Sequence, residues 1–144
     1  MPYTKIAIHL IWSTKNRAKI ITQKLKPELI RHIKENAIKK EINIQAINCV
    51  SDHIHILLFL HPSQTLSKVI QLIKGESSYW VNKNNLSKAK FEWQDEYIAL
   101  SVSESAIEKV RRYIARQEEH HRRRNFMEEY NLFLEKYGLG RNSG

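Results

Sequence analysis

Cysteine, glycine and proline are scarce in this sequence, with one, four and three copies among 144 residues. The single cysteine, Cys49, can form neither an intramolecular disulfide nor a cysteine-based zinc site, which favours a reducing compartment. No apolar run approaches the roughly 20 residues that span a bilayer. The N-terminus also lacks the pattern of a signal peptide. We therefore expect a cytoplasmic protein with no membrane partner.

Acidic residues are also few, because 15 Asp and Glu stand against 24 Lys and Arg, giving a formal net charge of +9. Such a balance favours a polyanionic partner, nucleic acid first and an anionic membrane surface second. Charge alone leaves a merely basic protein as an open alternative. The length and the 42% hydrophobic fraction fit one compact domain. We expect this domain at 1–137, followed by a flexible, glycine-bearing tail at 138–144.

Hydrophobic periodicity alternates between the spacing of strands and that of helices. It predicts strands at 3–12, 42–50, 53–60 and 97–102. It predicts helices near 27–38, at 66–80, from Ser103 or Ser105 to about 124, and at 126–137. This order, with a hairpin in the middle, predicts an α+β fold with an antiparallel sheet and packed helices, close to a ferredoxin-like layout.

The segment His53-Ile54-His55 opens one of the predicted strands. Residues two apart in a strand point to the same face, so both imidazoles should project together while Ile54 points into the core. Two imidazoles on an otherwise apolar strand are costly unless something satisfies them. A divalent metal would do so, since neutral imidazole is a common ligand. Two partly exposed histidines at a strand end remain the alternative.

Tyr113 and Gln117 lie one turn apart on a predicted helix and so share a face. A phenol has an ordinary pKa of about 10 and is a poor nucleophile unless a base or metal helps it. The amide oxygen of Gln117 could complete a metal site. An ordinary half-buried tyrosine and a solvated glutamine are the alternative reading.

Basic and aromatic residues interleave at several points of the chain. Cations follow phosphates, and aromatic faces stack on unpaired bases, so this pattern favours single-stranded nucleic acid. The alternative is that the tryptophans belong to the core and the arginines to a solvated helix face. The residues predicted to contact DNA are Trp12, Lys15, Arg17, Lys74, Ser77, Arg112 and Arg116.

Four stretches together resemble the HUH single-tyrosine transposases, including the REP-associated tyrosine transposase group. They are 51–58, 73–80, 93–97 and 110–121. The resemblance covers nearly the whole chain in order. A histidine pair followed by Tyr-x-x-x-Gln is far more specific than either motif alone.

The resemblance implies that Tyr113 is the nucleophile and that His53, His55 and Gln117 hold Mg²⁺ or Mn²⁺. Such enzymes cut and rejoin single-stranded DNA at element ends through a 5′-phosphotyrosine, often near a recognised hairpin. The resemblance also implies a homodimer in the bacterial cytosol or nucleoid. Two imidazoles and an amide form a softer ligand set than Mg²⁺ prefers, so Mn²⁺ should support activity well.

Several alternatives stay open at this point. A rolling-circle replication initiator or relaxase uses the same histidine-pair chemistry. A domesticated or catalytically silent module that grips hairpin DNA would share the charge and the aromatics. His120 or His121 could supply or replace a metal ligand, and the sequence does not tell whether Tyr113 serves its own subunit or a partner.

Overall fold

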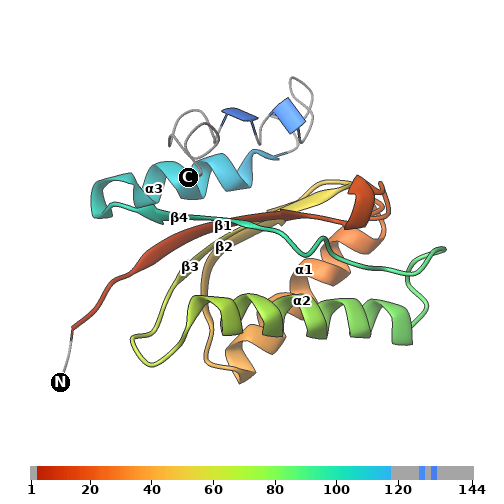
Figure 1. Cartoon of the computed structure of the whole chain (residues 1–144), viewed down its shortest axis with the longest axis horizontal. Helices are drawn as coiled ribbons and strands as arrows, with labels where there is room; N and C mark the ends of the chain where they lie inside the picture. Colours follow the sequence, from red (N-terminus) through yellow and green to blue (C-terminus); the bar gives the residue numbers. More distant parts are fainter. Residues whose placement is uncertain (1–2, 118–126, 129–130, 133–144) are drawn as a thin grey trace.

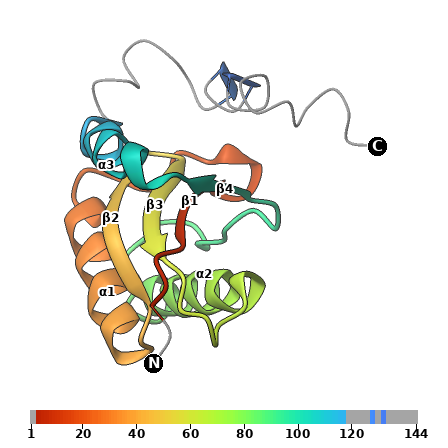
Figure 2. The same ribbon diagram turned by 90° about the vertical axis from the view of Figure 1, so that its left-hand side faces the viewer.

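The structure is a computed structural model that describes residues 3–117, 127–128 and 131–132. Within these residues one four-stranded sheet carries two helices on one face and a third helix on the other (Figures 1 and 2). The strands are β1 (Ala7–Ser13), β2 (Asn43–Cys49), β3 (His53–Phe59) and β4 (Ile98–Val102). The helices are α1 (Leu25–Lys39), α2 (Leu66–Lys83) and α3 (Ile107–Ala115).

The sheet has the order β2-β3-β1-β4, and every neighbouring pair is antiparallel. Strands β1 and β3 occupy its centre, and α1 and α2 connect β1 to β2 and β3 to β4. This is the ferredoxin-like α+β layout that the order of elements predicted, and the prediction is confirmed.

The main core lies between the sheet and the helices α1 and α2. Alternate residues of the two central strands point into it, including Leu10 of β1 with Ile54 and Ile56 of β3, all with 0% exposure. Residues at helical spacing meet them from the helices. These include Leu29 and Ile33 of α1, and Ile70 and Ile73 of α2.

The opposite face of the sheet carries only α3 and smaller apolar clusters. One cluster joins the sheet to α3, and it contains Ala7, Leu57, Ile107 and Ile114. Another lies near β4, and it contains Ile11, Ile98 and Leu100. The rest of this face is available for polar side chains, and it holds the candidate site.

Helix α3 is tied to the edge strand β2 by two side chains. Asn48 Nδ2 donates to the carbonyl of Ile114 at 2.9 Å, and Arg111 Nη1 donates to the carbonyl of Gln45 at 3.1 Å. The first bond satisfies a carbonyl in the last turn, where helices lack internal partners. These contacts fix the position of the tyrosine that α3 carries.

The C-terminal predictions meet the structure only in part. Helix α3 ends at Ala115, whereas the pattern predicted a helix to about residue 124. The rest of that prediction, with His120 and His121, lies outside the described residues, as do most of the predicted helix at 126–137 and the tail at 138–144. None of the described helices is both long and apolar enough to cross a membrane.

Candidate active site

His53 and His55 lie on the face of β3 that α3 covers, and both are fully buried. Their ring centroids are 5.2 Å apart with an interplanar angle of 63°. Across the sheet, β1 places Ser13 opposite His53 and Ile11 opposite His55. The strand period thus brings the two imidazoles together, as their spacing predicted.

Each imidazole is held by a second buried side chain. Asp52 Oδ1 lies 2.9 Å from His53 Nδ1, and His9 Nε2 lies 2.9 Å from His55 Nδ1. A histidine that binds a metal through one ring nitrogen usually engages the other with such a group, which fixes its tautomer and ring orientation. Because Nδ1 of each ring makes one of these contacts, Nε2 is the atom of each ring that could bind a metal ion.

Tyr113 of α3 reaches this cluster from above the sheet. Its ring centroid is 5.7 Å from that of His55 and 6.3 Å from that of His9, with edge-on geometry in both cases. All three residues belong to the same chain. Tyr113 therefore lies beside the histidine of its own chain.

Gln117 follows Tyr113 by four residues, just beyond the end of α3, and its side chain is fully buried. Its Nε2 donates to the carbonyl of Tyr113 at 3.4 Å. Its Oε1 has no hydrogen-bond partner among the described residues. A buried amide oxygen in that condition is costly, and a cation would satisfy it.

Gln117 matters because the usual metal-binding side chains are too few at this site. No group of three or more His, Cys, Asp and Glu side chains within the described ranges is arranged to hold a metal ion. A site built on His53 and His55 therefore needs a ligand of another type. The unsatisfied oxygen of Gln117 fits that requirement, because imidazole nitrogen and amide oxygen together suit a divalent transition-metal ion.

Four of the basic residues predicted to contact DNA lie at the surface. Arg112 and Arg116 are exposed at the C-terminal end of α3, beside Tyr113. Lys15 and Arg17 are exposed in the short turn that follows β1. Lys15 Nζ lies 3.5 Å from a carboxylate oxygen of Glu92, an exposed pair of little energetic weight. These four positions remain compatible with DNA contact.

The structure contradicts the predictions for Trp12 and Ser77, because both side chains are 1% exposed. Trp12 points to the α1 and α2 face and packs edge-on against Trp93 at 6.0 Å. Ser77 lies on the inner face of α2, where its Oγ donates to the carbonyl of Ile73 and accepts from Trp93 Nε1. Ser77 therefore belongs to the core, and Trp12 borders a cavity beside the 94–97 segment but has no exposed face on which a base could stack.

Lys74 also has a role different from the predicted contact with DNA. Its Nζ donates to the carbonyls of Gln94, Asp95 and Glu96 at 2.6, 3.0 and 3.3 Å. It also lies 5.5 Å from the ring centroid of Tyr97. Partial burial lowers the pKa of Lys74, and the nearby Asp95 carboxylate opposes this shift. The ammonium group therefore holds the 94–96 segment in place.

His9 and Asp52 are the site residues that sequence reasoning missed. In a strand, Ile8, Leu10 and Trp12 share one face and His9 points to the other. A histidine on that second face, between Ala7 and Ile11, was the available signal. For Asp52, its place between the two predicted strands at 42–50 and 53–60 gave no signal of a site role.

A histidine pair on a central strand, faced by a tyrosine from a covering helix, is the arrangement implied by the resemblance to the HUH single-tyrosine transposases. Comparison with known families agrees, because residues 2–117 match the model described as "Transposase IS200 like". The chain belongs to the IS200-like transposase family.

A curated relative and two solved structures are similar to the chain. The ISDra2 transposase TnpA of Deinococcus radiodurans is 25% identical over 119 residues, which cover 78% of this chain and 84% of that protein. A crystal structure from Deinococcus radiodurans R1, provisionally described as a transposase, has a TM-score of 0.64 and 23% identity, and the match covers 81% of this chain and 93% of the other. A REP-associated tyrosine transposase bound to a REP hairpin has a TM-score of 0.63 and 17% identity, with coverages of 84% and 72%. At these identities the two structures support the fold alone.

Proposed function

We propose that this chain is a DNA transposase that cuts and rejoins single-stranded DNA at element ends through a 5′-phosphotyrosine at Tyr113. The observation that carries the proposal is the position of the Tyr113 ring, 5.7 Å from the ring of His55 in the same chain. The half-buried Tyr113 ring stands beside the buried imidazoles of His55 and His9, and the buried Gln117 follows four residues later. This arrangement supports the proposal, because a tyrosine nucleophile and its assisting groups would then be in place before DNA binds.

In the proposed reaction, Tyr113 Oη attacks the scissile phosphorus. The bond from Oη to phosphorus forms as the bond from phosphorus to the 3′ oxygen breaks. The phenolic proton passes to water, and the departing 3′ oxygen takes a proton to become a free hydroxyl. One phosphodiester replaces another, so rejoining by a 3′-hydroxyl needs no nucleotide hydrolysis.

His53, His55 and Gln117 would hold a Mg²⁺ or Mn²⁺ ion in this proposal. When bound, such an ion polarises the scissile phosphate and stabilises its developing charge. Asp52 and His9 keep the two imidazoles in the orientation that binding requires. The nitrogen-rich set of ligands favours good activity with Mn²⁺.

The proposed partner is single-stranded DNA with a hairpin at the element end. The net charge of +9 and the exposed Lys15, Arg17, Arg112 and Arg116 support binding to a phosphate backbone. A structural neighbour bound to a REP hairpin supports the hairpin as a candidate ligand. We further propose a homodimer that acts in the bacterial cytosol or nucleoid. In this proposal each subunit's active site is formed by its own chain, because Tyr113 lies beside His55 of the same chain.

Covalent trapping tests the proposed function. A random-sequence single-stranded DNA library with a 3′ label is incubated with the protein and Mn²⁺, and covalent adducts are resolved on a denaturing gel. The wild type should form a labelled adduct, because a 5′-phosphotyrosine retains the 3′ fragment. Tyr113→Phe should bind the same DNA, measured by fluorescence anisotropy, yet form no adduct. An undiminished adduct in this variant would disprove the nucleophile assignment.

The same assay separates the main alternative and tests the single-chain site. A wild type that binds DNA but forms no adduct would instead support a silent hairpin-binding module. Tyr113→Phe and His55→Ala proteins are then mixed. Because Tyr113 faces His55 of its own chain, the mixture should stay inactive. Recovered activity would mean that a dimer exchanges its tyrosine helices.

A further inference from the structure

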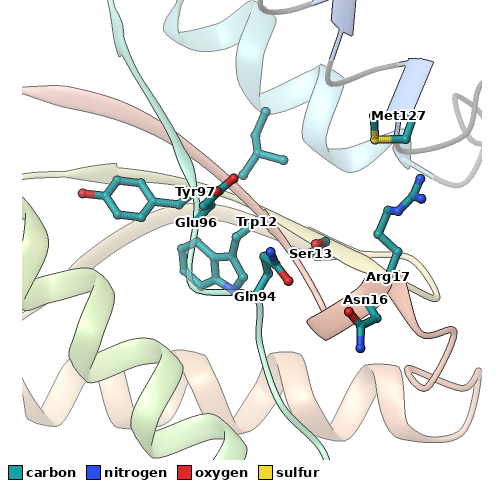
Figure 3. Close-up of a pocket in the computed structure, with 9 residues that line it drawn as sticks. Trp12, Ser13, Asn16, Arg17, Gln94, Glu96, Tyr97 and Met127 are labelled. Carbon is teal, nitrogen blue, oxygen red and sulfur yellow. The ribbon is translucent and has the colours of Figure 1, made fainter.

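A cavity of about 440 Å³ opens near the end of β1. Figure 3 draws the side chains that line it. The cavity lies between the end of β1, the turn that follows it and the segment 94–97. Ile11 and Ser13 line it, and these residues are the cross-strand partners of His55 and His53. Side chains directly opposite in a sheet are about 5 Å apart at Cβ. The cavity therefore adjoins the proposed position of the scissile phosphate, and its volume suits a small flat ligand.

The lining is of mixed polarity, which suits a base better than a phosphate. Arg17, Asn16 and Gln94 offer hydrogen-bond donors, and Glu96 offers a carboxylate that repels phosphate. Tyr97 is 41% exposed and presents an aromatic face on which a base can stack. Amides, a carboxylate and an aromatic ring are the groups that read the edges and faces of unpaired bases.

One wall of the cavity is a strained turn. Asn16 and Arg17 have φ values of 57° and 54°, in a left-handed region that asparagine tolerates but that is unusual for arginine. The turn is held by Arg17 N donating to the carbonyl of Thr14 at 3.0 Å, and by Thr14 Oγ1 donating to the carbonyl of Ala18 at 2.7 Å. Strain that the surroundings maintain is typical of binding and catalytic sites.

The opposite wall is held by Lys74. Its three bonds to carbonyls of residues 94–96 fix the backbone that carries Gln94, Glu96 and Tyr97. Gln94 N also donates to the carbonyl of Ser13 at 2.9 Å, which joins this wall to β1. Both walls are therefore formed before a ligand enters, and a preformed pocket loses less entropy on binding.

We propose that this cavity binds one unpaired nucleobase next to the scissile phosphate and selects bases that carry an exocyclic amino group. The Glu96 carboxylate accepts a hydrogen bond from that amino group, and the Tyr97 ring stacks on the base. Cytosine offers such a donor where thymine offers a carbonyl, so cytosine is preferred. The placement of the cavity beside the phosphate rests on the proposed function.

Binding of two matched pyrimidine oligonucleotides tests this inference. The full chain is titrated into labelled dC6 and dT6 in EDTA, and anisotropy gives both Kd values. The wild type should bind dC6 about tenfold more tightly, the discrimination expected of one charged hydrogen bond. Glu96→Leu should reduce the ratio to below about twofold. The matched control Glu92→Leu removes a carboxylate that does not line this cavity and should keep the ratio.

Two results would overturn the inference. The first is equal wild-type affinity for dC6 and dT6. The second is a Glu96→Leu protein that binds both oligonucleotides more tightly with an unchanged ratio, which would make Glu96 a plain negative charge. The assay uses neither the tyrosine nor a metal. A retained ratio without any covalent adduct would therefore reject only the proposed function, and an adduct without the ratio would reject only the base pocket.

Discussion

The two faces of the sheet are built for different purposes. The face under α1 and α2 is continuous and apolar, and its largest buried side chains include Trp12, Leu29 and Ile56. The face under α3 has smaller apolar clusters and buries polar groups, among them His9, His53 and His55. Strand β3 serves both faces through alternate residues. One layer therefore holds most of the apolar core, and the other accepts costly polar burial where the candidate site lies.

Adjacent residues of β3 offer the strongest test of this division. Ile56→Ala should lower the free energy of unfolding by about 2–5 kcal/mol, because it opens a cavity in the main core. It should leave the covalent adduct intact at temperatures where the protein stays folded. His55→Ala should reduce adduct formation by at least about 100-fold. The free energy of unfolding of His55→Ala should fall less than that of Ile56→Ala, because the substitution also removes the cost of burying a polar imidazole.

Urea unfolding and adduct yield measure these two effects separately. The division between the faces would fail if Ile56→Ala abolished adduct formation in a folded protein. It would also fail if His55→Ala were the less stable of the two variants.

A second prediction concerns the contact between His9 and His55. For His55 to bind a metal through Nε2, its Nδ1–H must donate to His9 Nε2 across the observed 2.9 Å. His9→Met removes the acceptor and should weaken Mn²⁺ binding by about 10–100-fold. His9→Gln keeps an acceptor oxygen and should restore most of the affinity. Electron paramagnetic resonance of free Mn²⁺ measures both without DNA, and equal affinities for the two variants would exclude this orienting role.

The smallest predicted effect concerns the attachment of α3. Asn48→Ala removes the donor to the carbonyl of Ile114 and should cost about 1 kcal/mol locally. Amide hydrogen exchange in α3 should then quicken about fivefold, while exchange in α1 stays unchanged. The control Asn43→Ala lies on the same strand, and the Asn43 side chain accepts a bond from Gln45 Nε2 at 2.6 Å rather than bonding α3 directly. Equal acceleration in α1 would show that the two faces open together.

Local patterns explain what the sequence could predict. The alternation of β3 and the helical spacing of Tyr113 and Gln117 are short-range, so the face that each residue occupies could be inferred. The pairing of β1 with β3 is not local, and His9 meets His55 across 46 residues. Residue type also could not distinguish DNA contact from a structural role. Trp12 and Lys74 match a DNA-binding pattern, yet Trp12 packs in the core and Lys74 holds the 94–96 segment.

The turn between β2 and β3 has a consequence for engineering. The carbonyl of Asp52 accepts a bond from Thr14 N at 2.8 Å, while its side chain contacts His53. The turn at 14–17 is therefore fastened to the residue that orients His53. Grafting that turn from a relative would disturb His53, whereas exchanging the exposed side chain of Glu96 would not. Under the proposed base pocket, segment 94–97 is thus the place to change base preference without disturbing His53.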